Sequence, residues 1–400
     1  MIRGHWLPAW GLLLLGGLGP AFALGQGADA ARIEQCRQAV LACQLPDGAV
    51  VAVPYRELGR PALVEPYFAH LACCGVLAAE QIRPNAQNRA FVNGWLKWYA
   101  RRQKTDRGIF VLEGKRGATG LVDVTRKAPD SIDAYAGLYL YVAGRHAQLT
   151  RTPLDPDVAA ACVRMLETLE SCHNQNDLFW NFPLTAKPAG VTPAEYLLDN
   201  VEVHQGLTAI SGPLATAGYQ KEAARAEKWA TKLGHRLGDY WSPRHGYYVC
   251  MFGDRAAQTP FGKQPLHAEG LATVTALGLF NNMPLTRREA LWRRFQTAYA
   301  KQLEVGYGTA NYPLEEPTIE RVYLAAVRAA PRVERDRHRI LLRARVDALL
   351  ERNSRLGTAA ALTDGNPFPF CHRFGLMLIA LASPEGKATP YLPGVSLSND

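Results

Sequence analysis

The chain has 400 residues, of which 48% are hydrophobic and 20% are charged. This is an ordinary composition for a soluble globular protein, with a core large enough for one large domain or two. The formal net charge of +9 is moderately basic and favours an acidic partner. Because no nucleic-acid motif accompanies this charge, we exclude nucleic acid as a partner, and an acidic polysaccharide is the more natural anion.

The N-terminus has the pattern of a secretory signal peptide. Arg3 precedes an apolar run over 6–18, and Ala21-Phe22-Ala23 provides small residues at the spacing of a cleavage site. Cleavage after Ala23 would remove residues 1–23 and leave 24–30 as a linker. A membrane anchor is disfavoured because the run is short and is interrupted by Pro and Gly. We therefore expect a periplasmic or extracellular protein that has no membrane attachment after cleavage.

An exported chain exposes its cysteines to an oxidising compartment. The eight are Cys36, Cys43, Cys73, Cys74, Cys162, Cys172, Cys250 and Cys371. Some could form disulfides, whose connectivity does not follow from the sequence. Two are followed by His, in Cys172-His173 and Cys371-His372, which superficially resembles a zinc site. Because no CxxC or HExxH spacing accompanies these pairs, we predict neither a metal nor another cofactor.

Helical periodicity predicts twelve helices. Their ranges are 31–45, 66–80, 87–103, 130–147, 155–172, 198–218, 220–238, 266–280, 286–304, 317–330, 333–352 and 368–383. Every odd-numbered helix in this order is followed by a long connection, and the even-numbered helices are followed by short turns. Connections longer than about 12–15 residues are uncommon in compact domains and are usually functional.

The character of the helices alternates in the same order. Helices 220–238 and 333–352 carry many charges and suit an outer position, whereas 130–147 and 266–280 are rich in Ala, Gly and Leu and suit an inner one. Six outer–inner pairs predict an all-α fold, an (α/α)6 toroid over 31–383, followed by a C-terminal tail over 384–400. An open solenoid would share the alternation. We favour the closed ring because there are six pairs and no obvious capping repeat.

In such a toroid all the long loops lie at one end, next to the N-termini of the inner helices. The free N–H groups and positive dipole ends of these helices then face one basin, which suits an anionic or hydroxyl-rich ligand. The other end, closed by short turns, should be inert.

Carboxylates stand at the entrances of the predicted inner helices. The candidate catalytic acids are Asp130, Asp133, Asp199, Glu202 and Glu269. A structural alternative is that Asp130 caps its helix while Asp133 bonds back to it, and Asp199 could cap in the same way. Glu269 is harder to explain structurally because it lies in an apolar run, where an acid needs a partner or a function.

The residues expected to bind substrate are aromatic residues and histidines near the same entrances. They are Tyr67, Trp180, His204, Trp241, Tyr247, His267, Phe370 and His372. Flat rings above a pair of acids suit carbohydrate chemistry, because sugars stack on rings and paired acids hydrolyse glycosidic bonds. Histidines at such positions are more often satisfied structural residues. A basic stretch precedes Asp130, and it is either a solvated loop or a basic lip for a uronic acid: Lys104, Arg107, Lys115, Arg116, Arg126 and Lys127.

Three segments resemble the six-hairpin glycosidase superfamily. They are Glu65-Pro66-Tyr67-Phe68-Ala69, Asp130-Ser131-Ile132-Asp133-Ala134-Tyr135 and Asp199-Asn200-Val201-Glu202-Val203. The Asp-Ser-x-Asp-x-Tyr segment is similar to one in exported toroid proteins linked to polysaccharide metabolism. The resemblance implies the (α/α)6 fold of bacterial glycoside hydrolases and polysaccharide lyases over most of the mature chain.

We therefore expect an exported glycoside hydrolase that acts on a polysaccharide or oligosaccharide, an acidic one included, by paired-carboxylate catalysis. Two alternatives stay open. One is a polysaccharide lyase that uses His204 or a nearby Tyr. The other is a non-catalytic periplasmic carbohydrate-binding or assembly protein of an exopolysaccharide system.

Overall fold

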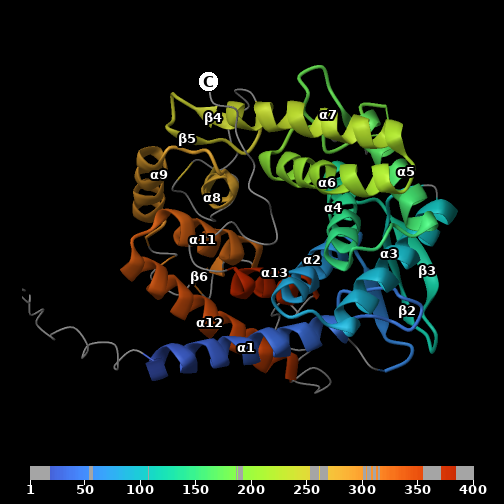
Figure 1. The fold of residues 1–400 in the computed structure, drawn as a ribbon, viewed down its shortest axis with the longest axis horizontal. Coiled ribbons are helices and arrows are strands. Elements are labelled where there is room, and N and C mark those ends of the chain that lie inside the picture. Colours follow the sequence, from blue (N-terminus) through green and yellow to red (C-terminus); the bar gives the residue numbers. More distant parts are fainter. Residues whose placement is uncertain are drawn as a thin grey trace, which may run out of the picture.

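The computed structural model describes residues 19–53, 57–106, 108–185, 187, 192–252, 261, 269–300, 303, 308–309, 312–313, 316–354 and 371–383. Within these ranges the chain forms twelve α-helices arranged as two concentric rings (Figure 1). The inner ring consists of α2 (Pro66–Ile82), α4 (Asp133–Thr150), α6 (Leu197–Thr216), α8 (Glu269–Leu279), α11 (Glu316–Ala329) and α13 (Cys371–Ala382). The outer ring consists of α1 (Gly19–Leu41), α3 (Ala86–Asp106), α5 (Pro156–Cys172), α7 (Gln220–Arg236), α9 (Leu285–Ala298) and α12 (Arg332–Ser354).

The inner ring is closed. Each inner helix contacts the next one in order, and α13 packs extensively against α2, so the last helix pair meets the first. This confirms the predicted (α/α)6 toroid and rules out the open solenoid, in which the terminal pairs would not touch. The turns 83–85, 151–155, 217–219, 280–284 and 330–331 that leave inner helices are short, as predicted.

The inner helices pack closely because small residues face each other. In α4 every residue from Asp133 to Gly144 is buried. Helix α6 lies against α4 at Gly137 and Gly206, where a Cβ on Gly206 would overlap the carbonyl oxygen of Gly137. Outer helix α7 is instead amphipathic, with Ala226 and Leu233 buried and its charged residues on the other face.

Gly206→Ala is expected to lower the free energy of unfolding by about 2 kcal/mol or more, because the added methyl forces α4 and α6 apart. Thr208→Ala is the control, since Thr208 lies on the exposed face of the same helix and should change stability by less than about 0.5 kcal/mol. Urea unfolding followed by circular dichroism measures both. Equal stabilities of the two variants would contradict the close approach.

The long connections that precede inner helices hold short strands, which the sequence interpretation left as loops. An antiparallel sheet of order β1-β2-β3 is formed by β1 (Pro61–Val64), β2 (Val111–Arg116) and β3 (Leu121–Lys127). Two hairpins are formed by β4 (Trp241–Ser242) with β5 (Tyr247–Tyr248), and by β6 (Gly308–Thr309) with β7 (Tyr312–Pro313). A 3-10 turn over Leu237–Tyr240 precedes β4. These strands lie in the connections that enter α2, α4, α8 and α11, at the end where the inner helices begin.

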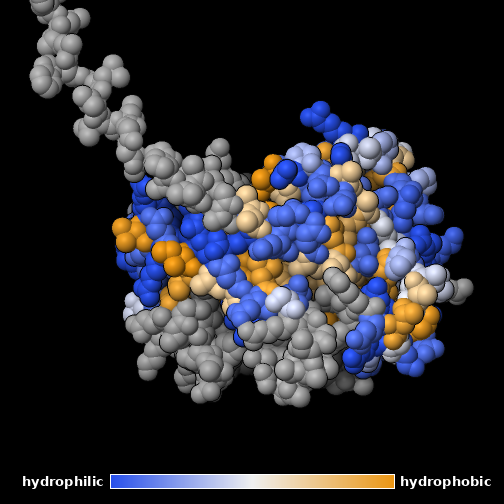
Figure 2. All heavy atoms as spheres, turned by 90° about the horizontal axis from the view of Figure 1, so that it is seen from below, coloured by the Kyte–Doolittle hydropathy of each residue, from blue (hydrophilic) through white to orange (hydrophobic). Residues whose placement is uncertain are grey.

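Helix α1 begins before residue 31, where the first helix was predicted. Asp29 pairs with Arg343 of α12 through two contacts of 2.7 Å, and Arg32 pairs with Asp347 at 2.8 and 2.7 Å. These ion pairs join the first and last outer helices. The face to which α1 and α12 contribute is largely hydrophilic, with hydrophobic residues in small groups (Figure 2).

All eight cysteines fall within the described ranges, and none forms a disulfide. Cys250 is partly exposed and the others are buried, so they pack as small apolar side chains. In the described part of the chain, no helix combines the length and the apolar character needed to cross a bilayer.

Candidate active site

The entrances of four inner helices meet through side-chain contacts. The Tyr67 hydroxyl of α2 donates to Glu202 Oε1 of α6 at 3.0 Å, and Arg321 of α11 lies 4.0 Å from the same oxygen. In the ring, α4 separates α2 from α6, and α8 separates α6 from α11. A side chain of α6 that reaches both α2 and α11 must therefore lie near the axis of the toroid, and this side chain is Glu202.

Helix α4 does not begin as the capping alternative required. Its first residue is Asp133, its N-cap residue is Ile132, and no side chain caps it. Asp130 therefore is not an N-cap, and the capping explanation of this acid is wrong. Asp199 lies in the first turn of α6, whose N-cap position is held by Tyr196. Both aspartates are thus available for other interactions.

Asp133 and Asp199 are joined by one hydroxyl. Ser131 Oγ lies 2.7 Å from Asp133 Oδ1 and 3.2 Å from Asp199 Oδ2, and the Ala134 backbone N–H donates to Asp133 Oδ1 at 2.8 Å. A serine hydroxyl has one proton to donate, so it satisfies both acids only if one of them is protonated and donates back. Burial, together with the charge of Asp199, raises the pKa of Asp133 well above its usual value, and burial raises that of Asp199 to about 7. The geometry therefore requires a proton on at least one of the two carboxyl groups.

Glu202 is the most central acid, and only 2% of its surface is exposed. Its Oε1 accepts from Tyr67, whereas its Oε2 has no hydrogen-bond partner among the described residues. Burial is the main cause that raises the pKa of Glu202 to about 8, and the charge of Asp199 adds to it. At neutral pH this side chain is therefore mostly protonated, with one free oxygen.

A second hydroxyl-bridged pair lies closer to the surface. Tyr135 Oη is 3.1 Å from Glu65 Oε1 and 3.0 Å from Asp130 Oδ1. Burial raises the pKa of Glu65 to about 7, and the negative charge of Asp130 adds to the increase. Asp130 itself is exposed. The Tyr135 hydroxyl also has only one proton to donate. When it contacts both carboxyl groups, one of them must therefore be protonated.

Two further acids lie at the entrances of α8 and α11. Glu320 is fully buried beside Arg321 at 3.4 Å, and burial raises its pKa to about 7. Glu269 accepts the backbone N–H of Cys250 at 2.7 Å, and Cys250 in turn accepts from Leu197 N at the start of α6. Burial raises the pKa of Glu269 to about 7. Glu269 thus binds backbone and not another predicted acid.

We call Glu65, Asp130, Asp133, Asp199, Glu202 and Glu320 the acidic cluster. Four of the five predicted catalytic acids fall within it, and Glu269 lies outside its contacts. A scan of family models and a search of curated proteins found no match to the sequence.

Solved structures do match. A cold-adapted family 8 xylanase superimposes with a TM-score of 0.54 at 10% identity, over 95% of each chain. A cellobiose 2-epimerase from Spirochaeta thermophila gives 0.51 at 13% identity, over 84% of this chain and 86% of that one. A glycosidase variant gives 0.50 at 15% identity, over 90% and 98%. The chain shares the (α/α)6 toroid fold of these structures. At these identities the likeness concerns the fold alone, so the roles of residues must come from the geometry of the site.

In this toroid, several aromatic residues predicted to bind sugar make packing contacts. Trp241 meets Tyr248 edge-on, with ring centroids 5.3 Å apart, and Tyr247 stacks on Phe261 at 4.7 Å. Trp180 is half-buried and donates its Nε1–H to Glu195 at 2.6 Å. Tyr67, by contrast, contacts the acidic cluster through its hydrogen bond to Glu202.

The histidines predicted to bind substrate lie in different surroundings from one another. His372, at the start of α13, stacks on Phe68 with ring centroids 3.9 Å apart. His204 follows Glu202 by two residues on α6, and residues two apart point to nearly opposite sides of a helix. His204 is therefore not placed beside Glu202. His267 and Phe370 lie outside the described residues.

Five residues of the site are outside the predicted catalytic and binding sets: Glu65, Glu320, Ser131, Tyr135 and Arg321. Ser131 and Tyr135 were part of the motif, but each was given no role, although each bridges two acids. Arg321 was missed. The adjacent charges of Glu320 and Arg321 interrupt the apolar face of α11, and the reasoning applied to Glu269 would have identified both.

Three of the six residues of the predicted basic lip form ion pairs with nearby acids. Lys115 pairs with Asp123 at 3.0 Å, and Lys127 pairs with Glu113 at 2.5 Å. Arg126 reaches Asp106 at 2.8 Å. Arg107 lies outside the described residues. The paired members of the lip stabilise the β2–β3 hairpin, so they are not free cations for a uronic acid.

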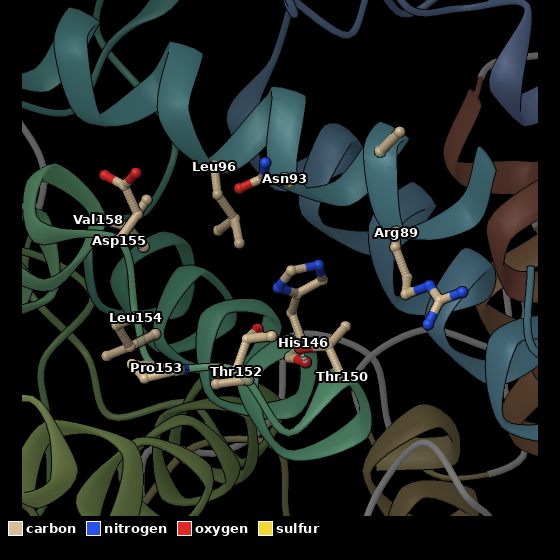
Figure 3. Close-up of a pocket in the computed structure, with 12 residues that line it drawn as sticks. Arg89, Asn93, Leu96, His146, Thr150, Thr152, Pro153, Leu154, Asp155 and Val158 are labelled. Carbon is tan, nitrogen blue, oxygen red and sulfur yellow. Dashed lines mark hydrogen bonds between the residues drawn. The ribbon is translucent and has the colours of Figure 1, made fainter. Parts of the chain in front are cut away.

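A cavity of about 430 Å³ lies at the opposite end, near the turn from α4 to α5, and is lined by Arg89, Asn93, His146 and Asp155, among others (Figure 3). It shares no residue with the acidic cluster. Its carboxylate, Asp155, caps α5 and pairs with Lys97 at 2.8 Å. The cavity therefore offers no second pair of acids.

Within the described ranges, no three His, Cys, Asp or Glu side chains are grouped so that they could hold a metal ion. The two Cys-His pairs have other contacts. His173 stacks near Trp229, with ring centroids 5.4 Å apart, and Cys371 Sγ contacts the Phe68 carbonyl at 3.7 Å.

Proposed function

We propose that this protein is an exported glycoside hydrolase that cleaves a polysaccharide or oligosaccharide by paired-carboxylate catalysis. The observation that carries the proposal is the meeting of Asp133, Asp199 and Glu202 at one end of the toroid, each acid buried or half-buried with a raised pKa. Raised carboxyl pKa values are what general acid–base catalysis near neutral pH needs. The neighbouring folds, a xylanase, a glycosidase and a sugar epimerase, support the same substrate class.

The acid and the base should belong to different parts of the cluster. Acids that hydrolyse a glycosidic bond must flank it, with roughly 6.5–9.5 Å between them for inversion and about 5–5.5 Å for retention. Because Ser131 bridges Asp133 and Asp199, no sugar fits between these two. We assign Glu202 as the proton donor, through its free Oε2, and the half-exposed Asp199 as the residue that acts on water or on the anomeric carbon.

The test is a panel of neutral, amino and acidic polysaccharides incubated with the purified mature protein. A hydrolase releases reducing ends without ultraviolet absorbance. A lyase releases products that absorb in the near ultraviolet, and a binding protein retains the polymer without cleaving it. Cleavage without absorbance that is lost in Glu202→Gln supports the proposal, and either other outcome refutes it.

The lyase alternative has less support. A lyase needs a cation that neutralises the uronic carboxylate and a base near the sugar. Arg321, the cation that reaches the acidic cluster, already faces Glu320 and Glu202. His204, the predicted base, points away from the Glu202 side of α6.

Export is also a proposal, and it has its own test. Cleavage after Ala23 should give a mature chain that begins at Leu24 and keeps Asp29 and Arg32, which bind α12. We expect intact-mass measurement of protein recovered from the periplasm or medium of a bacterial host to show this N-terminus. A full-length chain found in the cytosol would contradict export.

A further inference from the structure

The acidic cluster has far more negative than positive groups. Carboxyl groups reach it from the entrances of α2, α4, α6 and α11, and no Lys lies within ion-pair distance of them in the described part of the chain. Arg321 is the described cation that contacts the cluster, and it lies 3.4 Å from Glu320 and 4.0 Å from Glu202. With one proton in each bridged pair and Glu202 protonated, three carboxyl groups of the cluster can still ionise beside the guanidinium of Arg321.

Several buried polar atoms of the site lack a partner among the described residues. Asp133 Oδ2 and Glu202 Oε2 accept no hydrogen bond, although their residues are 0% and 2% exposed. Gln205, three residues after Glu202 and therefore on the same side of α6, has neither its amide nitrogen nor its oxygen bonded and is 1% exposed.

Buried polar groups in proteins are nearly always hydrogen-bonded, so these atoms indicate a ligand or ordered water. A cationic donor lowers the pKa of a neighbouring carboxyl group, so that Asp133 Oδ2 and Glu202 Oε2 ionise and accept its N–H groups. The unbonded amide of Gln205 can both accept from and donate to sugar hydroxyls. A ligand that matches both demands carries hydroxyl groups and a cationic donor.

We propose that the sugar bound at the acidic cluster carries a free amino group, so that the substrate is a glycan containing unacylated amino sugars. This inference rests on the proposed carbohydrate function of the same site. An ammonium has three N–H donors and places positive charge beside Asp133, Asp199 and Glu202, the acids that have no Lys or Arg in hydrogen-bond contact.

A uronic acid fits the same surroundings poorly. Its carboxylate would meet like charges at the cluster, and the guanidinium of Arg321 already faces two glutamates. Two of the three lip lysines, Lys115 and Lys127, are paired with Asp123 and Glu113. The inference therefore departs from the acidic glycan that the basic sequence stretch suggested.

The test compares matched monosaccharides, so that no linkage has to be known. Isothermal titration at pH 6.5 measures glucosamine, galactosamine and mannosamine against glucose, galactose and mannose, and against glucuronate and galacturonate. At least one amino sugar should bind about tenfold or more tightly than its neutral parent, because a charge-assisted hydrogen bond to a carboxylate contributes about 1.5–3 kcal/mol. The uronates should bind most weakly.

Repeating the titration in buffers of different ionisation enthalpy gives a second readout. An ammonium beside partly protonated acids lowers their pKa, so binding of the amino sugar should release protons to the buffer, whereas binding of the neutral parent should not. Glu202→Gln should reduce the preference for the amine to a few-fold or less. Glu227→Gln, an exposed change on α7, should leave the preference unchanged.

Equal affinity for the amino and neutral sugars, or no binding of any amino sugar, overturns the inference. The proposed hydrolase would survive this result if a neutral polysaccharide of the panel is still cleaved in a Glu202-dependent way. Failure of the hydrolase with preserved amine preference would instead indicate an amino-glycan binding protein.

Discussion

Glu202→Gln is expected to lower kcat on the cleaved polysaccharide by about two to four orders of magnitude, the contribution typical of a general acid. Glutamine keeps the size of the side chain and can still accept from Tyr67, so the fold and substrate binding should persist. It cannot deliver a proton from the position of Oε2. Initial rates of reducing-end release across a range of substrate concentrations separate the loss in kcat from any change in KM.

Two further variants test whether the loss of activity comes from the proton on Glu202. Tyr67→Phe removes a hydrogen bond that lowers the pKa of Glu202, so the alkaline limit of the pH–rate profile should move to higher pH. Glu227→Gln, an exposed change on α7, should leave both the rate and the profile unchanged. If Glu202→Gln retains more than about a tenth of the wild-type rate, Glu202 is not the proton donor.

The helical framework was predictable because it depends on local periodicity. The charged face of α7 and the small residues of α4 show, respectively, which helices are outer and which are inner. Long and short connections then fix which ends of the helices come together. The exact entrances were less predictable. Helix α4 was expected to begin at Asp130 and begins at Asp133, and the segment before it is held by a distant contact, from the Ile132 backbone N–H to the Asn181 carbonyl at 2.8 Å.

The candidate acids were predictable as a set, but their pairing was not. Ser131 reaches Asp199 across 68 positions of sequence, and Tyr67 reaches Glu202 across 135. These contacts depend on how each helix is rotated about its axis relative to its neighbours. The hydrophobic periodicity of a single sequence does not determine that rotation. The strands of the long loops escaped prediction for a related reason. They are short and are stabilised by pairing with distant segments, as in the register of Ala62 with Gly114.

The free energy of unfolding should fall as pH rises from about 5 to 8, which is the second large effect that we expect. Burial raises the pKa of Asp199, Glu65, Glu269 and Glu320 to about 7, and that of Glu202 to about 8. Below the unfolded-state pKa, both the folded and the unfolded chain hold these protons. Between that value and the folded-state pKa, the unfolded chain releases them while the folded chain keeps them, so folding becomes less favourable as pH rises.

Thermal or urea unfolding at several pH values measures this slope, to which each such group contributes at most about 1.4 kcal/mol per pH unit. Glu202→Gln should flatten the slope and be more stable than wild type at pH 8, while near pH 4.5 the two proteins should differ little. Glu34→Gln is the opposite control. Its hydrogen bonds to Arg37 lower the pKa of Glu34 to about 2, so its contribution is lost only in acid and the slope above pH 5 should not change.

A flat profile between pH 5 and 8 in the wild-type protein would mean that the acids of the cluster are ionised in the folded state, and the assignment of Glu202 as a proton donor would fall with it. If the free energy of unfolding falls with pH in the wild type and falls less in Glu202→Gln, the loss of stability comes from the Glu202 carboxyl group, which is the proposed proton donor. Acids held protonated in a buried site destabilise the fold at neutral pH, and such a cost is expected where the same protons serve a reaction. Loss of activity together with a gain in alkaline stability, in one variant, is therefore the joint outcome that a merely structural Glu202 would not produce.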